Sequence, residues 1–181
     1  MPGGGKSTVG RHLARRLDAP FLDTDVAIER RIGCAIRSYF EQEGEERFRD
    51  LEADVLTDVL AECHGVLATG GGVVLRDANR RLLRDRSICV YLRSTPEELF
   101  RRLRRDTKRP LLQVADPLGR LRQLFAERDA LYREAAHFVI ETGRPSVPTL
   151  VNMILMQLEL AGVIDPQDVP SPVDAPPRDE R

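Results

Sequence analysis

The stretch GGGKST at residues 3–8 contains the residue types that bind a polyphosphate. In a glycine turn the backbone N–H groups can point at the phosphates, and a helix that follows adds its partial positive charge. Lys6 can reach the β- and γ-phosphates, and the Ser7 hydroxyl can ligate Mg²⁺. The alternative is a plain glycine-rich turn capped by serine. Apolar residues at helical spacing from Val9 to Leu17 place a helix directly after the loop, which favours phosphate binding.

The acidic residues Asp23 and Asp25 follow the short apolar stretch PFL. We expect this stretch to be a strand, and open α/β sheets place their ligands at the carboxyl ends of strands. One carboxylate can hold a water molecule on Mg²⁺ while the other accepts a proton from the hydroxyl of an acceptor. Asp25 also precedes an apolar helix, so it can instead be the N-cap of that helix. The spacing alone leaves both interpretations of Asp25 open.

The glycines of TGGG at residues 69–72 also follow a strand-like apolar stretch. Glycine tolerates positive φ angles and lets a small substrate approach the backbone closely. An ordinary turn is the alternative. The sequence therefore predicts either a second ligand-binding turn at the same end of the sheet or a plain connection between two elements.

The densest basic run is RRLRRDTKRPLL at residues 101–112. A run of this kind usually forms a solvated helix face or a nucleic-acid patch. Here it leads into a loop of about a dozen residues, and loops of that length in compact domains often serve as active-site lids. We place this lid at about 104–118. Arg49 and Arg133 lie on helices that carry several other arginines, where a surface ion pair is the more common role.

Strand-like and helical segments alternate along the chain, which predicts βαβ crossovers and a parallel sheet covered by helices on both faces. We expect a helical region over about 25–62 with an interruption at EGEE, and later helices at 76–85, 96–105, 118–136 and 147–160. Four strands are expected, within PFLDTD, GVLATGGG, ICVYL and FVIE. This pattern predicts one three-layer α/β/α domain over residues 1–162. Residues 163–181 are rich in proline and acids, which predicts a disordered tail.

The composition argues against several classes of protein. The chain has 181 residues, a formal net charge of -1 and a pI near 6.3, so its charge predicts neither a nucleic-acid nor a membrane partner. No apolar run reaches the roughly 18 residues of a membrane span, and the start has no signal-peptide segment. The three cysteines are odd in number and widely spaced, which is typical of reduced thiols. We therefore expect a cytoplasmic protein.

The motifs occur together, and in this order, in one known family. From residue 1 to about residue 160 the sequence resembles the shikimate kinases, which belong to the P-loop group related to nucleoside monophosphate kinases. The matching segments are GGGKSTVGRHLA, FLDTDVAIE, EGEERFRDLE, LATGGGVV, RPLL, and ERDALYREAA followed by FVIET. The most specific are DTDxxIE, the FR of ERFRDLE, GGG and LYR. The resemblance implies a kinase that uses ATP to phosphorylate the 3-hydroxyl of shikimate, on the route to chorismate and the aromatic amino acids. We also expect a monomer.

The resemblance also implies roles for individual residues. Asp25 would bind the ring hydroxyls of shikimate and act as the base or positioner for the attacking one. Lys6 would act on the phosphates, and Arg109 would neutralise the transferring phosphate as the lid closes. The implied ATP-binding residues are Gly3, Gly4, Gly5, Lys6, Ser7, Thr8, Arg102, Arg109 and Arg144. The implied shikimate-binding residues are Asp25, Arg49, Gly71, Gly72 and Arg133. One Mg²⁺ per subunit is assigned to Ser7 and, through a water molecule, to Asp23.

The family pattern begins before this sequence does. A strand and the first glycine of the complete loop, GxxxxGK[ST], would precede Met1. In the family this strand is central in a parallel sheet of order 2-3-1-4-5, so we expect the chain to lack the first central strand. Its two neighbours are then expected to face an open slot, with unpaired backbone groups. Two rival functions stay open: a P-loop kinase for another small acceptor such as gluconate or a nucleotide, and a non-catalytic nucleotide-binding module.

Overall fold

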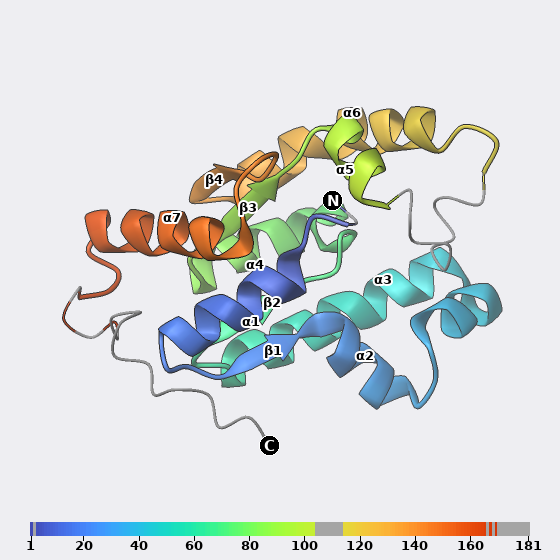
Figure 1. The fold of residues 1–181 in the computed structure, drawn as a ribbon. Coiled ribbons are helices and arrows are strands. Elements are labelled where there is room, and N and C mark those ends of the chain that lie inside the picture. The colour runs from blue at the N-terminus through green and yellow to red at the C-terminus, as the bar shows by residue number, and fades with distance from the viewer. Residues whose placement is uncertain (2, 104–113, 166, 168, 170–181) are drawn as a thin grey trace, which may run out of the picture.

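The computed structural model describes residues 1, 3–103, 114–165, 167 and 169. Helices and strands alternate along this part of the chain, as the sequence predicts (Figure 1). The elements are α1 (Lys6–Arg16), β1 (Phe21–Asp23), α2 (Thr24–Ile32), α3 (Ile36–Glu62), β2 (Val66–Ala68), the 3₁₀ helix η1 (Val73–Leu75), α4 (Asp77–Arg86), β3 (Val90–Arg93), α5 (Pro96–Leu103), α6 (Pro117–Ala135), β4 (Phe138–Glu141) and α7 (Val147–Leu160). Of the predicted lid, positions 104–113 lie outside the described residues.

The four strands form two parallel pairs. β1 pairs with β2, beginning with Phe21 opposite Val66, and β3 pairs with β4, beginning with Val90 opposite Phe138. Within the residues that the structure describes, no strand joins β2 to β3. The two pairs therefore correspond to the outer strands, 2-3 and 4-5, of the predicted order 2-3-1-4-5. The predicted parallel pairing of the strands is confirmed.

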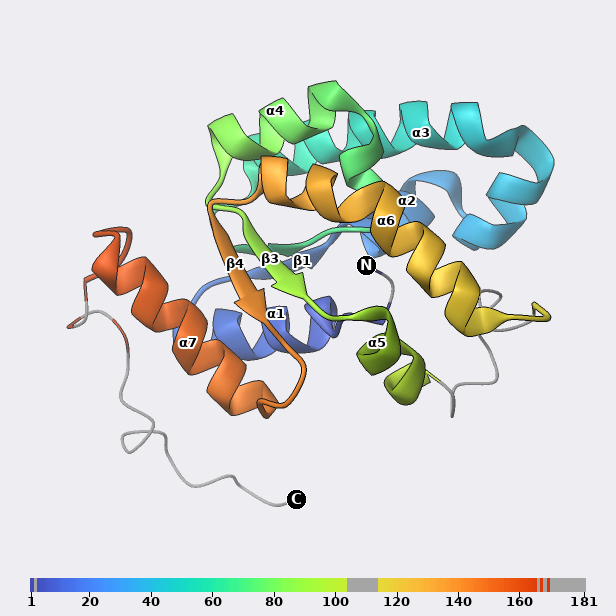
Figure 2. The same cartoon turned by 90° about the horizontal axis from the view of Figure 1, so that it is seen from above.

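Helices cover both faces of the strands, which confirms the predicted three-layer arrangement. Figure 2 shows α1 and α7 on one side of β3 and β4, and α4 and α6 on the other. On the first side, α1 buries Val9 and Leu13 in a cluster with Ile154 of α7. On the second side, Leu99 of α5 and Leu121 of α6 are fully buried in a larger cluster. Burial of one such side chain stabilises the fold by roughly 1.5–3 kcal/mol. Because these residues recur at helical spacing, they form one apolar face on each helix, and this face packs against the strands.

The helical region between β1 and β2 is divided at two glycines. α2 ends at Ile32, where Gly33 adopts a left-handed φ of 70°. α3 is kinked at Gly44, which has a φ of 83° and a ψ of 175°. The kink confirms the predicted interruption at EGEE. The end at Gly33 was not predicted, because the apolar periodicity from Ile28 to Ile36 runs across it. Glycine permits both breaks since it has no Cβ to strain at positive φ.

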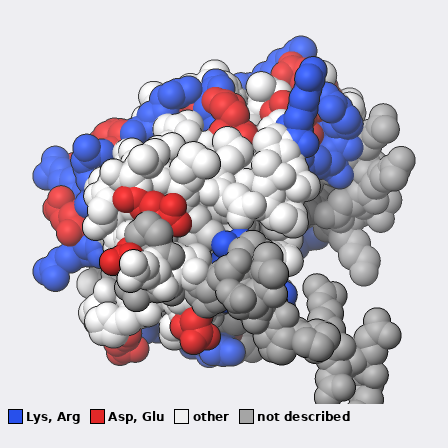
Figure 3. All heavy atoms as spheres, turned by 60° about the vertical axis from the view of Figure 1, so that its left-hand side comes forward, with Lys and Arg blue, Asp and Glu red and all other residues white. Residues whose placement is uncertain are grey.

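The face that carries α7 shows mainly uncharged atoms, with charges of both signs around them (Figure 3). Leu160 and Met156 of α7 are 77% and 56% exposed. Ile164 and Val169, which lie in the predicted tail, pack against the cluster between α1 and α7. Residues 170–181 of that tail lie outside the described part. None of the described helices combines the length and the apolar character that a membrane crossing requires.

Candidate active site

The loop before α1 has the backbone geometry of an anion-binding turn. Gly3 and Gly5 have φ angles of 73° and 76°, which are strained for any residue with a Cβ. Gly5 is the N-cap of α1 and makes no side-chain cap hydrogen bond. The N-terminus of a helix favours an anion through its N–H groups and its partial positive charge. Lys6 folds back over the turn, and its Nζ donates to the Met1 carbonyl oxygen at 3.0 Å. Thr8 is exposed on the first turn of the helix.

Ser7 and Asp23 are brought together by the packing of α1 against β1. The Ser7 Oγ donates to Asp23 Oδ2 at 2.6 Å, and Asp23 Oδ1 accepts from the Asp25 N–H at 3.0 Å. Asp23 is therefore the N-cap of α2, and the alternative that Asp25 caps this helix is wrong. This leaves the Asp25 carboxyl group available for chemistry.

The oxygens of Ser7 and Asp23 are hard donors of the kind that Mg²⁺ prefers. Among the described residues there is no group of three or more His, Cys, Asp or Glu side chains that could enclose a metal ion. A site built from one hydroxyl and one carboxylate suits Mg²⁺, because this ion usually keeps several waters and takes phosphate oxygens from the substrate. The residues present therefore fit the predicted ion.

The DTD and TGGG motifs meet at the carboxyl ends of β1 and β2. The buried Thr24 hydroxyl accepts from the Gly70 N–H at 3.0 Å and ties the two motifs together. A Cβ on Gly70 would lie 2.7 Å from Asp25 Oδ1 and 3.3 Å from Glu52 Oε1. Only glycine leaves room for both carboxyl groups beside the backbone here. The two acids therefore share one corner of the site.

This corner raises the pKa of both acids. Asp25 remains accessible to solvent, but burial of its carboxyl group by surrounding protein, together with the nearby Asp23, raises its pKa, and Lys6 opposes this. Burial also raises the pKa of Glu52, although the hydrogen bond from Arg49 opposes the shift. A carboxylate with a raised pKa is a better proton acceptor, which suits a general base.

Arg49 is held against the TGGG turn. Its Nη1 lies 2.7 Å from Glu52 Oε2, and its side chain is only 14% exposed. A Cβ on Gly72 would overlap the Arg49 guanidinium group, so glycine is required for this approach. Arg49 and Gly72, which the resemblance implies as shikimate-binding residues, therefore lie next to each other. Glu52, which the sequence did not single out, is 3% exposed and fixes the position of Arg49.

Helix α6 brings a different arginine to the site from the one that the sequence predicted. Arg128 Nη1 and the Tyr132 hydroxyl both donate to the Gly71 carbonyl oxygen, at 3.2 and 2.6 Å. The buried Arg128 Nε has no hydrogen-bond partner among the described residues. Arg133 instead pairs with Asp129 at 2.8 Å, and its side chain is 47% exposed.

The helical repeat explains this correction. Positions 128 and 132 are four residues apart and share one face of α6, whereas Arg133 shares a face with Asp129. The predicted Arg133 is therefore not brought to Gly71, and Arg128 takes that place. A signal in the sequence could have identified Arg128. It lies four residues before the tyrosine of LYR and therefore shares a helix face with the buried Tyr132.

Two further predicted residues, Arg102 and Arg144, lie near the loop after β4. The Arg102 guanidinium group donates to the Thr142 carbonyl oxygen and lies 3.3 Å from the Ser94 Oγ. Ser94 and Thr142 are fully buried. Arg144 is exposed two residues beyond Thr142. Arg109, predicted in the lid, lies outside the described residues.

Comparison with known proteins agrees with this geometry. The sequence model of the family "Shikimate kinase" matches residues 2–159. A shikimate kinase of Paracidovorax citrulli is 59% identical over 170 residues, which cover 92% of each chain, and one of Burkholderia thailandensis is 57% identical over 164 residues, 91% of this chain and 89% of the relative. The solved structure of a shikimate kinase from Acinetobacter baumannii in complex with shikimate has a TM-score of 0.82 and 47% identity, covering 90% of both chains. The chain belongs to the shikimate kinase family.

Proposed function

We propose that this chain transfers the γ-phosphoryl group of ATP to the 3-hydroxyl of shikimate, giving shikimate 3-phosphate and ADP. The observation that carries the proposal is the convergence of Arg49 and Arg128 on the TGGG turn beside the Asp25 carboxyl group. Two arginines can bind a carboxylate of the acceptor, and the Asp25 carboxylate can accept the proton of an acceptor hydroxyl. The relatives that share most of this chain are named shikimate kinases, and one solved relative is described as bound to shikimate.

Arg49 and Arg128 would hold the shikimate carboxylate against the backbone of Gly71 and Gly72. Arginine suits this task because its planar guanidinium group can make two parallel hydrogen bonds to a carboxylate. Arg49 is already oriented by Glu52, and the buried Nε of Arg128 has no hydrogen-bond partner among the described residues. This pair replaces the predicted combination of Arg49 with Arg133.

Asp25 would accept a hydrogen bond from the attacking hydroxyl and take its proton. The raised pKa of Asp25 increases its proton affinity, and the hydrogen bond that Asp23 accepts from the Asp25 N–H fixes the backbone there. Such positioning accounts for most of the catalysis in phosphoryl transfer, where proteins orient the reactants and stabilise charge.

The loop at residues 3–8 would bind the ATP phosphates through its N–H groups and Lys6. Ser7 and, through water, Asp23 would hold Mg²⁺, which when bound neutralises charge on the β- and γ-phosphates. Arg102, beside Ser94 and Thr142, would contact the adenine side together with Arg144. Arg109 remains proposed as the lid residue that neutralises the transferring phosphate. We also propose a cytoplasmic monomer, with a domain over residues 1–162.

The direct test is turnover of alternative acceptors by the purified chain. ADP release is followed with ATP and Mg²⁺ in the presence of shikimate, gluconate or a nucleoside monophosphate. We expect turnover with shikimate at a kcat/KM at least about 100-fold above the other acceptors, because only shikimate offers a carboxylate and a ring hydroxyl at the matching positions. Preference for another acceptor would replace the proposed substrate. Binding of ATP without transfer to any acceptor would instead identify a nucleotide-binding module.

A further inference from the structure

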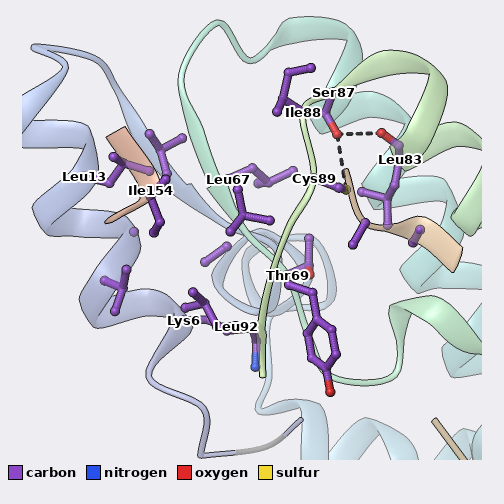
Figure 4. A pocket seen from close by; sticks show the side chains of 18 of the residues that line it. Lys6, Leu13, Leu67, Thr69, Leu83, Ser87, Ile88, Cys89, Leu92 and Ile154 are labelled. Carbon is purple, nitrogen blue, oxygen red and sulfur yellow. Dashed lines mark hydrogen bonds between the residues drawn. The ribbon is translucent and has the colours of Figure 1, made fainter. Parts of the chain in front are cut away.

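Neighbouring residues of β3 face opposite helical layers. Leu92 packs against the cluster that contains Ile154, on the side of α1 and α7. Tyr91 belongs to the cluster that contains Leu83, on the side of α4 and α6. Figure 4 shows Ile154 and Leu83 on opposite sides of the cavity of about 430 Å³ between the strand pairs. Because side chains alternate along a strand, Arg93 faces the same layer as Tyr91.

Asp129 of α6 binds both of these side chains of β3. Its Oδ1 accepts hydrogen bonds from the Tyr91 hydroxyl and from the Arg93 Nε, each at 3.0 Å. Its Oδ2 accepts from the Arg133 Nε at 2.8 Å. The Asp129 side chain is only 18% exposed. Burial alone would raise the pKa of Asp129, but the hydrogen bonds from its three donors outweigh burial and lower the pKa. The carboxylate therefore stays charged and joins α6 to β3.

Aromatic contacts fix the same part of α6. The Tyr132 ring stacks on the Tyr91 ring, with 4.8 Å between the centroids and 23° between the planes. The Arg93 guanidinium group lies over the Phe125 ring, 5.0 Å from its centroid. Tyr91 thus contacts α6 twice, through its hydroxyl at Asp129 and through its ring at Tyr132. Two residues of β3 therefore set the position of residues 125–132 of α6.

This part of α6 also makes the contacts to the TGGG turn. Arg128 and Tyr132 both donate to the Gly71 carbonyl oxygen, and Arg128 directly precedes Asp129. Residues 128–132 are therefore held between β3 on one side and Gly71 on the other. The Arg128 Nη1 lies 3.2 Å from the Gly71 oxygen. Since N–H···O hydrogen bonds span about 2.7–3.2 Å, a shift of α6 by about 1 Å away from the turn would break this contact.

We infer that Asp129 is a positioning residue for the acceptor site: its hydrogen bonds with Tyr91 and Arg93 hold α6 where Arg128 can bind the acceptor carboxylate. The inference rests on the proposed function for the role of Arg128, and Asp129 acts through Arg128 rather than on the acceptor. The bond to Arg133 adds little, because the Arg133 side chain is 47% exposed.

The test compares variants of the full chain with the wild type. Asp129→Ala should raise the KM for shikimate by at least about 10-fold and change kcat by less than about threefold, because a displaced Arg128 weakens acceptor binding. Asp129→Asn keeps an oxygen that accepts from the Tyr91 hydroxyl, so the KM should rise less. Glu141→Ala is the matched control. It removes the 59% exposed partner of Arg93 and should change the KM by less than about twofold.

A double-mutant cycle separates positioning from a loss of folded protein. If Asp129 acts through Arg128, adding Asp129→Ala to Arg128→Ala should change kcat/KM by less than about twofold. A loss of folded protein would instead lower kcat/KM by the same factor in both backgrounds. A second measurement needs no substrate. Hydrogen exchange at residues 66–75 should be faster in Asp129→Ala than in the wild type, because α6 is released from the Gly71 turn, and exchange in α7 should not change.

An unchanged KM in Asp129→Ala, or equal factors in the two backgrounds of the cycle, would overturn the inference. Unchanged hydrogen exchange at residues 66–75 would overturn it too, even in a chain that does not phosphorylate shikimate. Absence of shikimate turnover by the wild type would contradict the proposed function. Turnover by the wild type that Asp129→Ala leaves unaffected would contradict the positioning role alone, so the two failures are distinguishable.

Discussion

The assignment of Arg128 to the acceptor carboxylate makes a sharp prediction, because Arg133 on the same helix offers a matched control. Arg128 reaches the Gly71 carbonyl oxygen from a partly buried position, while Arg133 pairs with Asp129 at the surface. Replacing Arg128 by alanine removes charge-assisted hydrogen bonds to the acceptor in a partly desolvated site. Such a loss costs about 2–4 kcal/mol in kcat/KM for shikimate, or roughly 30- to 1000-fold. Arg49→Ala should cost a similar amount.

The control variant should behave differently for a stated reason. The Arg133 side chain is 47% exposed, and an exposed ion pair contributes at most about 1 kcal/mol to stability. Arg133→Ala should therefore change kcat/KM for shikimate by less than about threefold. Arg128→Lys should rescue activity poorly, since an ammonium group cannot make the planar two-point contact. ADP release measures kcat/KM, and calorimetry measures ATP affinity without acceptor, which none of these variants should change substantially.

The opposite pattern would refute the reasoning. If Arg133→Ala lost as much activity as Arg49→Ala while Arg128→Ala lost less than about threefold, the carboxylate would belong to Arg133. If the Arg128 variant lost ATP affinity and phosphoryl transfer to the same extent, Arg128 would not belong to the acceptor site. A fall in the thermal midpoint that accounts for the lost activity would show that Arg128 has a structural role at the Gly71 turn.

Lys6→Ala should lower kcat by at least about 100-fold, because a compensating charge on the transferring phosphoryl group is lost, and single-turnover kinetics would separate this from weaker ATP binding. Asp25→Asn should abolish most transfer and still raise the thermal midpoint, by more at about pH 7 than at about pH 4. The sign follows from the raised pKa: folding favours the protonated carboxyl, so Asp25 contributes stability that is lost as pH rises through its folded pKa. Thermal unfolding at both pH values checks this. Gly72→Ala should raise the KM for shikimate by at least about 10-fold with little change in ATP affinity, because the methyl group overlaps the Arg49 guanidinium group.

Much of the fold could be predicted because its signals are local. Helical periodicity and strand-like runs gave the alternation of elements, and the glycines and Lys6 of the first loop lie next to one another in sequence. The end of α2 at Gly33 was missed, because a single glycine between apolar residues at helical spacing leaves the periodicity intact. A left-handed φ is a property of the folded backbone, and the pattern of side chains does not report it.

The site was less predictable because its residues come from distant segments. The spacing of Asp23 and Asp25 could not show which of them caps α2, because the sequence does not fix whether this helix begins at Thr24 or at Val26. The hydrogen bond from the Ser7 hydroxyl to Asp23 joins residues 16 positions apart and depends on α1 packing against β1. Glu52 looked like one of many acids on a charged helix. Only the fold reveals that it is buried beside Arg49 and shares the Gly70 corner with Asp25.

The three glycines of the TGGG turn show how one short segment could organise the proposed acceptor site. Gly70 leaves room for two carboxyl groups, Gly71 presents its carbonyl oxygen to Arg128 and Tyr132, and Gly72 leaves room for Arg49. A side chain at either flanking position would push one charged partner away. The turn thus lies against the Asp25 carboxyl group and two arginine side chains. Because Glu52 orients Arg49 while Arg128 is anchored at the Gly71 carbonyl oxygen, we expect both arginines to contribute to the discrimination between acidic and neutral acceptors.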